Sequence, residues 1–176
     1  PVRGEFTLKG RQAKEQKDGL VGKVGHYSPT MYRGCSMKIT PAGKVELISC
    51  GFRQPNGLGF NAEGDLFATD NQGDWVGTSP LHHVTPGAFH GHPASLNWAP
   101  WFGGRDPVET PVAELEKLRK LPAIQFPQND MGGSVTQPLL DTTKGAFGPY
   151  AGQMLVGEWT YPRILRADLE KVRGEY

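Results

Sequence analysis

The chain has 176 residues, with 19 lysines and arginines against 18 aspartates and glutamates, so its formal net charge is only +1. This balance argues against nucleic acid or an anionic membrane surface as a partner, and no apolar run approaches the roughly 18 residues of a membrane-spanning helix. The 24 glycines and 15 prolines lie between short apolar runs, which favours a turn-rich β protein over disorder.

The apolar runs predict short strands separated by turns. Two hairpins are expected, one from residues 36–40 and 45–49 and one from residues 58–61 and 65–69. The remaining predicted strands are 19–24, 81–85, 153–158 and 163–168.

A helix is predicted in the segment TPVAELEKLRKL, residues 110–121. Thr110 suits the N-cap, Pro111 suits the first helical position, and aliphatic residues recur on one face. Pro122 would end the helix. Because the flanking GG, DP and QND signals are typical of loops, residues 94–133 are interpreted as an insertion within the larger segment 1–176.

The two cysteines flank the first predicted hairpin. A tight turn at Ala42-Gly43 places Thr40 opposite Val45, and continuing outward places Cys35 opposite Cys50. Opposed residues of an antiparallel pair have Cβ atoms within about 5.5 Å, near disulfide reach. The sequence therefore predicts a Cys35–Cys50 disulfide and with it an oxidising compartment; two small buried thiols are the alternative.

Two internal similarities bear on the fold. MKITPAG and HHVTPGA are spaced by 45 residues, as propeller blades are. DLFATD (65–70) and QMLVGE (153–158) share a polar, three apolar, small, acidic pattern, and each is followed by a predicted strand. An all-β propeller is therefore expected, with a β-sandwich as the alternative. Because the chain would supply only two to three blades, we expect it to be part of a longer protein.

A cluster of oxygen-bearing residues follows the strand at 65–69. Asp70, Asn71, Gln72, Gly73 and Asp74 offer side-chain and carbonyl oxygens of the kind that Ca²⁺ prefers. The alternative is an Asx-turn that simply ends the strand.

Arg53 and Gln54 precede the turn signal Pro55-Asn56-Gly57. A turn can fix the preceding arginine, and a fixed guanidinium suits a carboxylate or quinone oxygen. An ordinary surface arginine is the alternative.

Four histidines crowd into eleven residues: His82, His83, His90 and His92. On a strand, the last two would share a face and could ligate a transition metal or act as a base. The alternative is loop histidines with backbone partners. The sequence has no CxxCH, CxxC, GxGxxG or GxSxG motif.

The stretch GFRQPNGLGFNAEGDLFATDNQGDWVGTSPLHHVTPGAFHGHP resembles the glucose/sorbosone dehydrogenase-like propellers, particularly large secreted bacterial relatives called membrane-bound dehydrogenases. TTKGAFGPYAGQMLVGEW and RILRADLEKVRGEY resemble the next blade, so the likeness covers residues 34–93 and 134–176. It implies a six-bladed propeller, a carbohydrate or alcohol as substrate, and a periplasmic or secreted location. A fused c-type cytochrome domain or another electron acceptor is also implied.

The resemblance further implies pyrroloquinoline quinone (PQQ) and Ca²⁺ as cofactors. Arg53 and Gln54 match an Arg-Asn pair whose arginine contacts the quinone, and Gln54 departs from that pattern. The metal ligands would be Asp70, Gln72, Gly73 and Asp74.

In the reaction that this family performs, a hydride passes from a sugar hydroxyl carbon to the quinone while a histidine base takes the hydroxyl proton. No base can be placed in this chain. A non-catalytic propeller that binds a glycan or a protein partner, and a calcium-dependent lactonase-type hydrolase, are the alternatives.

Overall fold

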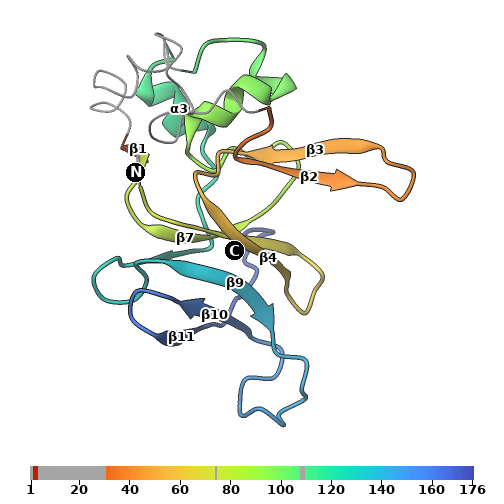
Figure 1. Ribbon diagram of the computed structural model, residues 1–176, viewed down its shortest axis with the longest axis vertical. Helices are drawn as coiled ribbons and strands as arrows, with labels where there is room; N and C mark the ends of the chain where they lie inside the picture. The colour runs from red at the N-terminus through yellow and green to blue at the C-terminus, as the bar shows by residue number, and fades with distance from the viewer. Residues whose placement is uncertain (1, 4–30, 74, 108–109) are drawn as a thin grey trace. The chain divides into compact units, whose positions relative to one another are not determined.

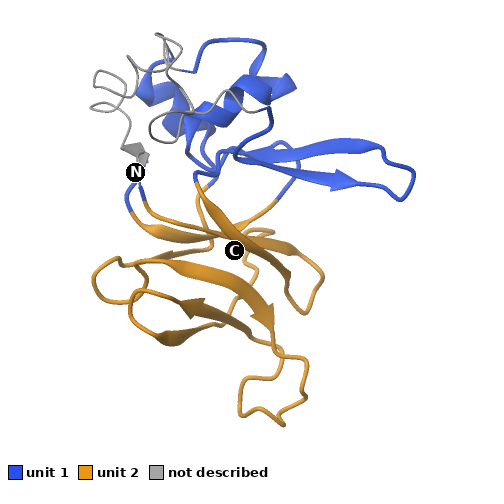
Figure 2. Ribbon diagram, viewed as in Figure 1, with its two compact units in different colours: residues 1–53, 73–77, 85–120 blue, residues 54–72, 78–84, 121–176 orange. Residues whose placement is uncertain are grey.

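The structure is a computed structural model that describes residues 2–3, 31–73, 75–107 and 110–176. The predicted strand at 19–24 lies outside these residues. Antiparallel sheets account for most of the regular structure, which confirms the all-β prediction. None of the helices in these ranges is long and apolar enough to cross a membrane. The chain divides into two compact units, coloured separately in Figure 2.

Unit 1 contains residues 1–53, 73–77 and 85–120. Its elements are the pair β1 (Val2–Arg3) and β6 (Trp75–Val76), the hairpin β2 (Cys35–Ile39) and β3 (Val45–Cys50), the 3-10 helices η1 (Pro93–Trp98) and η2 (Pro100–Phe102), and the helix α3 (Val112–Leu118). Its core consists of Cys50, Phe89, Ala94, Leu96, Ala99, Phe102 and Leu115.

The hairpin β2–β3 places Cys35 opposite Cys50, as predicted. Near the turn, however, the partner of Val45 is Ile39 rather than Thr40. A β-bulge further along the hairpin shifts the register by one residue and restores the cysteine pair.

The helix α3 is shorter than predicted. Pro111 is its N-cap residue, and Thr110 instead donates its hydroxyl hydrogen bond to the Asp106 carbonyl at 2.8 Å. Proline is compatible with this boundary because its fixed φ suits a helix start and its missing N–H is not needed there. The helix ends at Leu118, before Pro122.

Unit 2 contains residues 54–72, 78–84 and 121–176 and holds two sheets. In the first, β4 (Pro55–Phe60), β5 (Leu66–Asp70), β7 (Ser79–His83) and β8 (Ile124–Phe126) lie side by side in chain order. The second consists of β9 (Val135–Leu140), β10 (Met154–Glu158) and β11 (Arg163–Ala167), again in chain order. The sequence did not predict β8 or β9, and β8 lies inside the expected insertion 94–133.

The two sheets of unit 2 pack against each other through a shared core, with β4 and β5 lying next to β9 (Figure 1). Gly57 and Gly59 allow this approach, because a Cβ at either position would overlap Gln137 or the backbone of Pro138. The core residues are Phe67, Leu81, Phe126, Val135, Met154, Val156, Leu165 and Ala167.

The two sheets also share one construction. The last residue of the second strand pairs with the first residue of the first strand, Asp70 with Pro55 and Glu158 with Val135. In both sheets the first strand carries one extra residue beside this pair, a β-bulge. The internal similarity predicted between DLFATD and QMLVGE is therefore confirmed as a structural repeat.

Candidate functional site at the strand ends

The carboxylate of Asp70 closes the end of the first sheet. The backbone N–H of Gln54 donates to Asp70 Oδ1 at 2.7 Å, and the N–H of Asn71 donates to the same oxygen at 2.9 Å. Asp70 is buried, with 4% of its surface exposed. Its side chain therefore joins the start of β4 to the end of β5.

Glu158 makes the corresponding contacts in the second sheet. Its Oε1 accepts the N–H of Ser134 at 2.7 Å and that of Thr160 at 2.9 Å, while Oε2 accepts the N–H of Tyr161 at 2.5 Å. Burial by itself raises the pKa of Glu158, but these backbone N–H groups outweigh it and hold the pKa below its usual value. We call the two carboxylates, Asp70 and Glu158, the strand clamps.

An amide-rich cluster lies between the strand clamps. Asn56 Nδ2 donates to Asn71 Oδ1 at 3.1 Å and to the Val135 carbonyl at 2.8 Å. The Ser134 hydroxyl donates to the same Asn71 oxygen at 3.5 Å. Asn56 is exposed, and the other two side chains are half-buried. Solvent can therefore reach a fixed set of amide and hydroxyl groups, which we call the amide cluster: Asn56, Asn71 and Ser134.

Arg53 occupies space that Gly73 leaves open. A Cβ on Gly73 would overlap Arg53 Nε and lie 2.4 Å from its Cδ and Cζ. The guanidinium therefore lies flat against the backbone at Gly73, and only glycine permits this. Gln54, its predicted partner in cofactor binding, has an exposed side chain.

Hydrogen bonds engage several groups of the predicted calcium loop. Asp70 Oδ1 already accepts two N–H groups, and the N–H groups of Gln72 and Gly73 donate to Ser79 Oγ and the Val76 carbonyl. Asp74 lies outside the described residues. Within the ranges that the structure covers, no three His, Cys, Asp or Glu side chains come together to hold a metal. Calcium binding stays a prediction. The Asx-turn also stays a prediction, because Asp70 Oδ1 accepts the N–H groups of Gln54 and of the next residue, Asn71, whereas an Asx-turn uses the N–H two residues on.

The four histidines named from the sequence fall in two different units. His82 and His83 belong to β7 in unit 2, whereas His90 and His92 belong to unit 1. The last two lie in a loop and not on the strand that would give them a common face. Both are buried, and His90 Nε2 lies 3.2 Å from Ser49 Oγ. Since all four are at most 7% exposed, they are packed side chains in this structure.

Cys35 and Cys50 are free thiols that face each other across β2 and β3. Contact with the Cys50 thiol, together with burial, raises the pKa of the Cys35 thiol. Contact with the Cys35 thiol lowers the pKa of the Cys50 thiol in turn. The pair is thus placed for oxidation, and the disulfide stays a prediction.

If the disulfide forms, the unfolded protein should take up two alkyl groups only after reduction. The measurement is the intact mass after alkylation in denaturant, with and without a reductant, because denaturant exposes the fully buried Cys50. Uptake of both groups without a reductant would contradict the disulfide and the oxidising compartment inferred from it.

Sequence reasoning missed Glu158 and the amide cluster. Glu158 could have been found, because it occupies in QMLVGE the place that Asp70 occupies in DLFATD. Asn56 and Ser134 carry no such signal, since they meet only where β4 and β9 lie side by side.

Fold and site together define an all-β chain of repeated antiparallel sheets whose strand ends carry fixed polar groups. Comparison with protein-family models, curated proteins and solved structures finds no match in any of the three.

Proposed function

We propose that the two sheets of unit 2 are consecutive blades of a β-propeller. Three observations support this. The first sheet is a four-stranded antiparallel meander in chain order, the second repeats its construction, and the two pack face to face. A sandwich requires neither the repeat nor the matching strand clamps.

We propose further that this propeller handles a carbohydrate or an alcohol at the strand ends of unit 2. The observation that carries this proposal is the amide cluster, held between two strand clamps and open to solvent. Amide and hydroxyl groups both donate and accept hydrogen bonds, as sugar hydroxyls require. A rigid set of such groups loses little conformational entropy on binding.

In its catalytic form, the protein is a quinone-dependent sugar or alcohol dehydrogenase of the periplasm or cell exterior. PQQ would supply the hydride acceptor. Arg53 fits one part of this cofactor, because a guanidinium fixed against Gly73 can donate to a carboxylate or carbonyl oxygen. Among the described residues, no three His, Cys, Asp or Glu side chains come together to hold a metal, and the four described histidines are at most 7% exposed.

The second candidate is a propeller that binds a glycan or a protein partner without catalysis. The engagement of Asp70 by two backbone N–H groups and the burial of the four histidines favour it. A calcium-dependent hydrolase would need metal ligands beyond those that the described residues bring together.

The full-length protein separates these candidates. We expect Arg53→Ala to weaken PQQ binding about tenfold or more, because a charge-assisted hydrogen bond contributes roughly 1.5–3 kcal/mol. The measurements are calcium content, the absorption spectrum on titration with PQQ, and oxidation of a sugar panel with an artificial electron acceptor. Arg105→Ala is the control, because Arg105 is exposed and paired with Glu114.

The non-catalytic propeller is supported if sugar binds without PQQ, if Arg53→Ala leaves that binding unchanged, and if Asn71→Ala weakens it. If wild-type protein binds neither PQQ nor any sugar, both forms of the proposal are wrong.

A further inference from the structure

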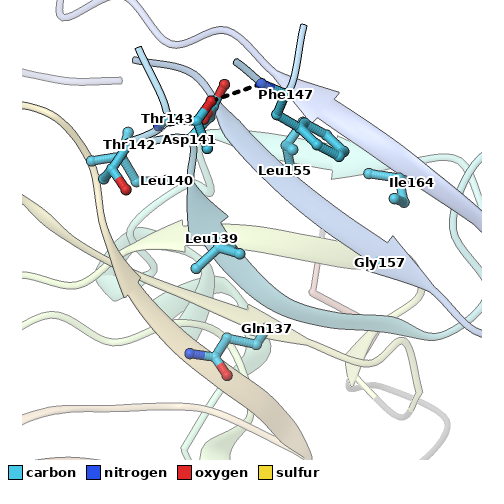
Figure 3. A pocket seen from close by; sticks show the side chains of 10 residues that line it. All are labelled: Gln137, Leu139, Leu140, Asp141, Thr142, Thr143, Phe147, Leu155, Gly157 and Ile164. Carbon is cyan, nitrogen blue, oxygen red and sulfur yellow. Dashed lines mark hydrogen bonds between the residues drawn. The ribbon is translucent and has the colours of Figure 1, made fainter. Parts of the chain in front are cut away.

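One face of the sheet β9-β10-β11 carries an apolar patch that is open to solvent, beside the exposed polar side chains of Gln137 and Arg166. The pairing register places Leu139 opposite Leu155, and Ile164 opposite Gly157. Leu139 and Ile164 are 64% and 65% exposed. Leu139, Leu155, Ile164 and Phe147, drawn in Figure 3, are among the residues that line a pocket of about 430 Å³. We call this surface the outer face: Leu139, Leu155, Gly157 and Ile164.

The opposite face of the same three strands is also apolar. Met154, Val156 and Leu165 point into the core shared with β4-β5-β7-β8 and are at most 6% exposed. An antiparallel sheet at the surface normally alternates apolar and polar residues, with the polar set in water. Apolar residues on both faces are typical of a sheet that lies between two others.

The structural repeat shows what each position of the outer face does in the preceding sheet. Phe67, opposite Gly59, corresponds to Leu155, opposite Leu139. By the same registers, the counterpart of Ile164 is Leu81, which pairs with Thr69. Phe67 and Leu81 have no exposed surface, and both belong to the core that the two sheets share. In the first sheet, these two positions are therefore buried against the second sheet.

We propose that the outer face of β9-β10-β11 is covered, in the intact protein, by a further antiparallel sheet of the same polypeptide. Its strands present aliphatic side chains at every second position, as Met154, Val156 and Leu165 do toward the first sheet. Only the assignment of this sheet to the same polypeptide rests on the proposed propeller. The apolar residues on both faces of the sheet and the structural repeat do not depend on the propeller.

The register also defines the edge of this interface. Arg166 lies opposite Leu155 on β11 and is exposed. A guanidinium covered by a second sheet needs an acceptor. The covering sheet therefore offers a carboxylate or a backbone carbonyl next to Arg166, outside its aliphatic rows.

The test is maleimide labelling of Ile164→Cys in the native full-length protein. Peptide mapping separates this site from Cys35 and Cys50. The control is Lys44→Cys at the β2–β3 turn, where the native side chain is 72% exposed. We expect labelling at position 164 to be at least about tenfold slower than at position 44, and to stay slow on dilution.

Equal labelling rates at the two positions in monomeric protein would overturn the proposal. Protection that disappears on dilution, together with loss of a dimer, would also overturn it and assign the face to a second copy. If the proposed function is wrong, wild-type protein binds neither PQQ nor sugar, whatever the labelling at position 164 shows. A failure of the proposed function is therefore distinguishable from a failure of this proposal.

A second variant keeps the test decisive if Ile164→Cys does not fold. In the full-length protein, Leu155→Ala should lower Tm about as much as Leu81→Ala, because both leucines then lie between sheets. A decrease no larger than that of Lys44→Ala would mean that the outer face is open to water.

Discussion

Replacing Phe67 with alanine is expected to lower the free energy of unfolding by about 3–5 kcal/mol, the usual cost of emptying a buried phenylalanine site. Phe67 is fully buried between the two sheets of unit 2. Its ring stacks on His83, with centroids 5.3 Å apart, and meets the edge of Tyr176 at 5.1 Å. Few atoms can move into the vacated space, because Gly59 opposite it already lies against Pro138.

Urea unfolding followed by circular dichroism gives this value. Leu58→Ala is the matched control, since Leu58 is the neighbour of Gly59 on β4 and is 50% exposed. We expect it to cost less than about 1 kcal/mol. A loss for Phe67→Ala no larger than for this control would contradict the packing of the two sheets.

Glu158→Gln should lower the free energy of unfolding by about 2–4 kcal/mol at neutral pH. The carboxylate accepts three backbone N–H groups through both of its oxygens, and charge-assisted bonds of this kind are the stronger ones. In glutamine one of the two oxygens is replaced by an NH₂ group, which cannot accept. At least one of the three N–H groups then loses its partner.

The loss of unfolding free energy caused by Glu158→Gln should also depend on pH. Because folding lowers the pKa of Glu158, the stabilisation is fully present above the ordinary glutamate pKa of about 4.3 and is lost as the pH falls through the lower folded value. The variant lacks this titration. The stability difference between wild type and Glu158→Gln is therefore widest above about pH 5 and narrows in acid.

Asp70→Asn is the matched comparison for the other strand clamp. Both backbone N–H groups donate to Oδ1, and asparagine keeps one carbonyl oxygen to accept them. We expect a smaller loss than for Glu158→Gln. If Asp70→Asn instead proves more damaging, and the loss is greater with calcium present than with a chelator, Asp70 is a metal ligand and the Asx-turn interpretation is wrong.

The sequence predicted the features that depend on local pattern. Alternating apolar residues between Gly and Pro turns predicted both hairpins, and the structure contains them with ends shifted by a few residues. The match of DLFATD to QMLVGE predicted equivalent strands, which the registers confirm. Such signals are readable because side chains of a strand alternate with a period of two, whatever the strand packs against.

The sequence was a poorer guide where long-range contact decides. The cysteine pair was predicted correctly, but the register near the turn was wrong by one residue, because the sequence of β2 and β3 does not reveal the β-bulge. The strand β9 was missed because Pro138 and Gln137 break its pattern, yet packing against β4 holds it as a strand. For His90 and His92 the sequence left a strand and a loop open, and the structure has both residues buried in a loop.

The sequence by itself therefore determined that this protein is built from short antiparallel strands with a repeated acid-terminated motif, because those features are local. Only the tertiary structure decided what the acids do. Asp70 was read from the sequence as a metal ligand, and Glu158 was not singled out. In the structure, each accepts the backbone N–H of the residue just before the strand that begins its sheet, and this joins residues 16 and 24 positions apart. A carboxylate serves equally as metal ligand or as hydrogen-bond acceptor, and the neighbours that folding brings to it select between the two.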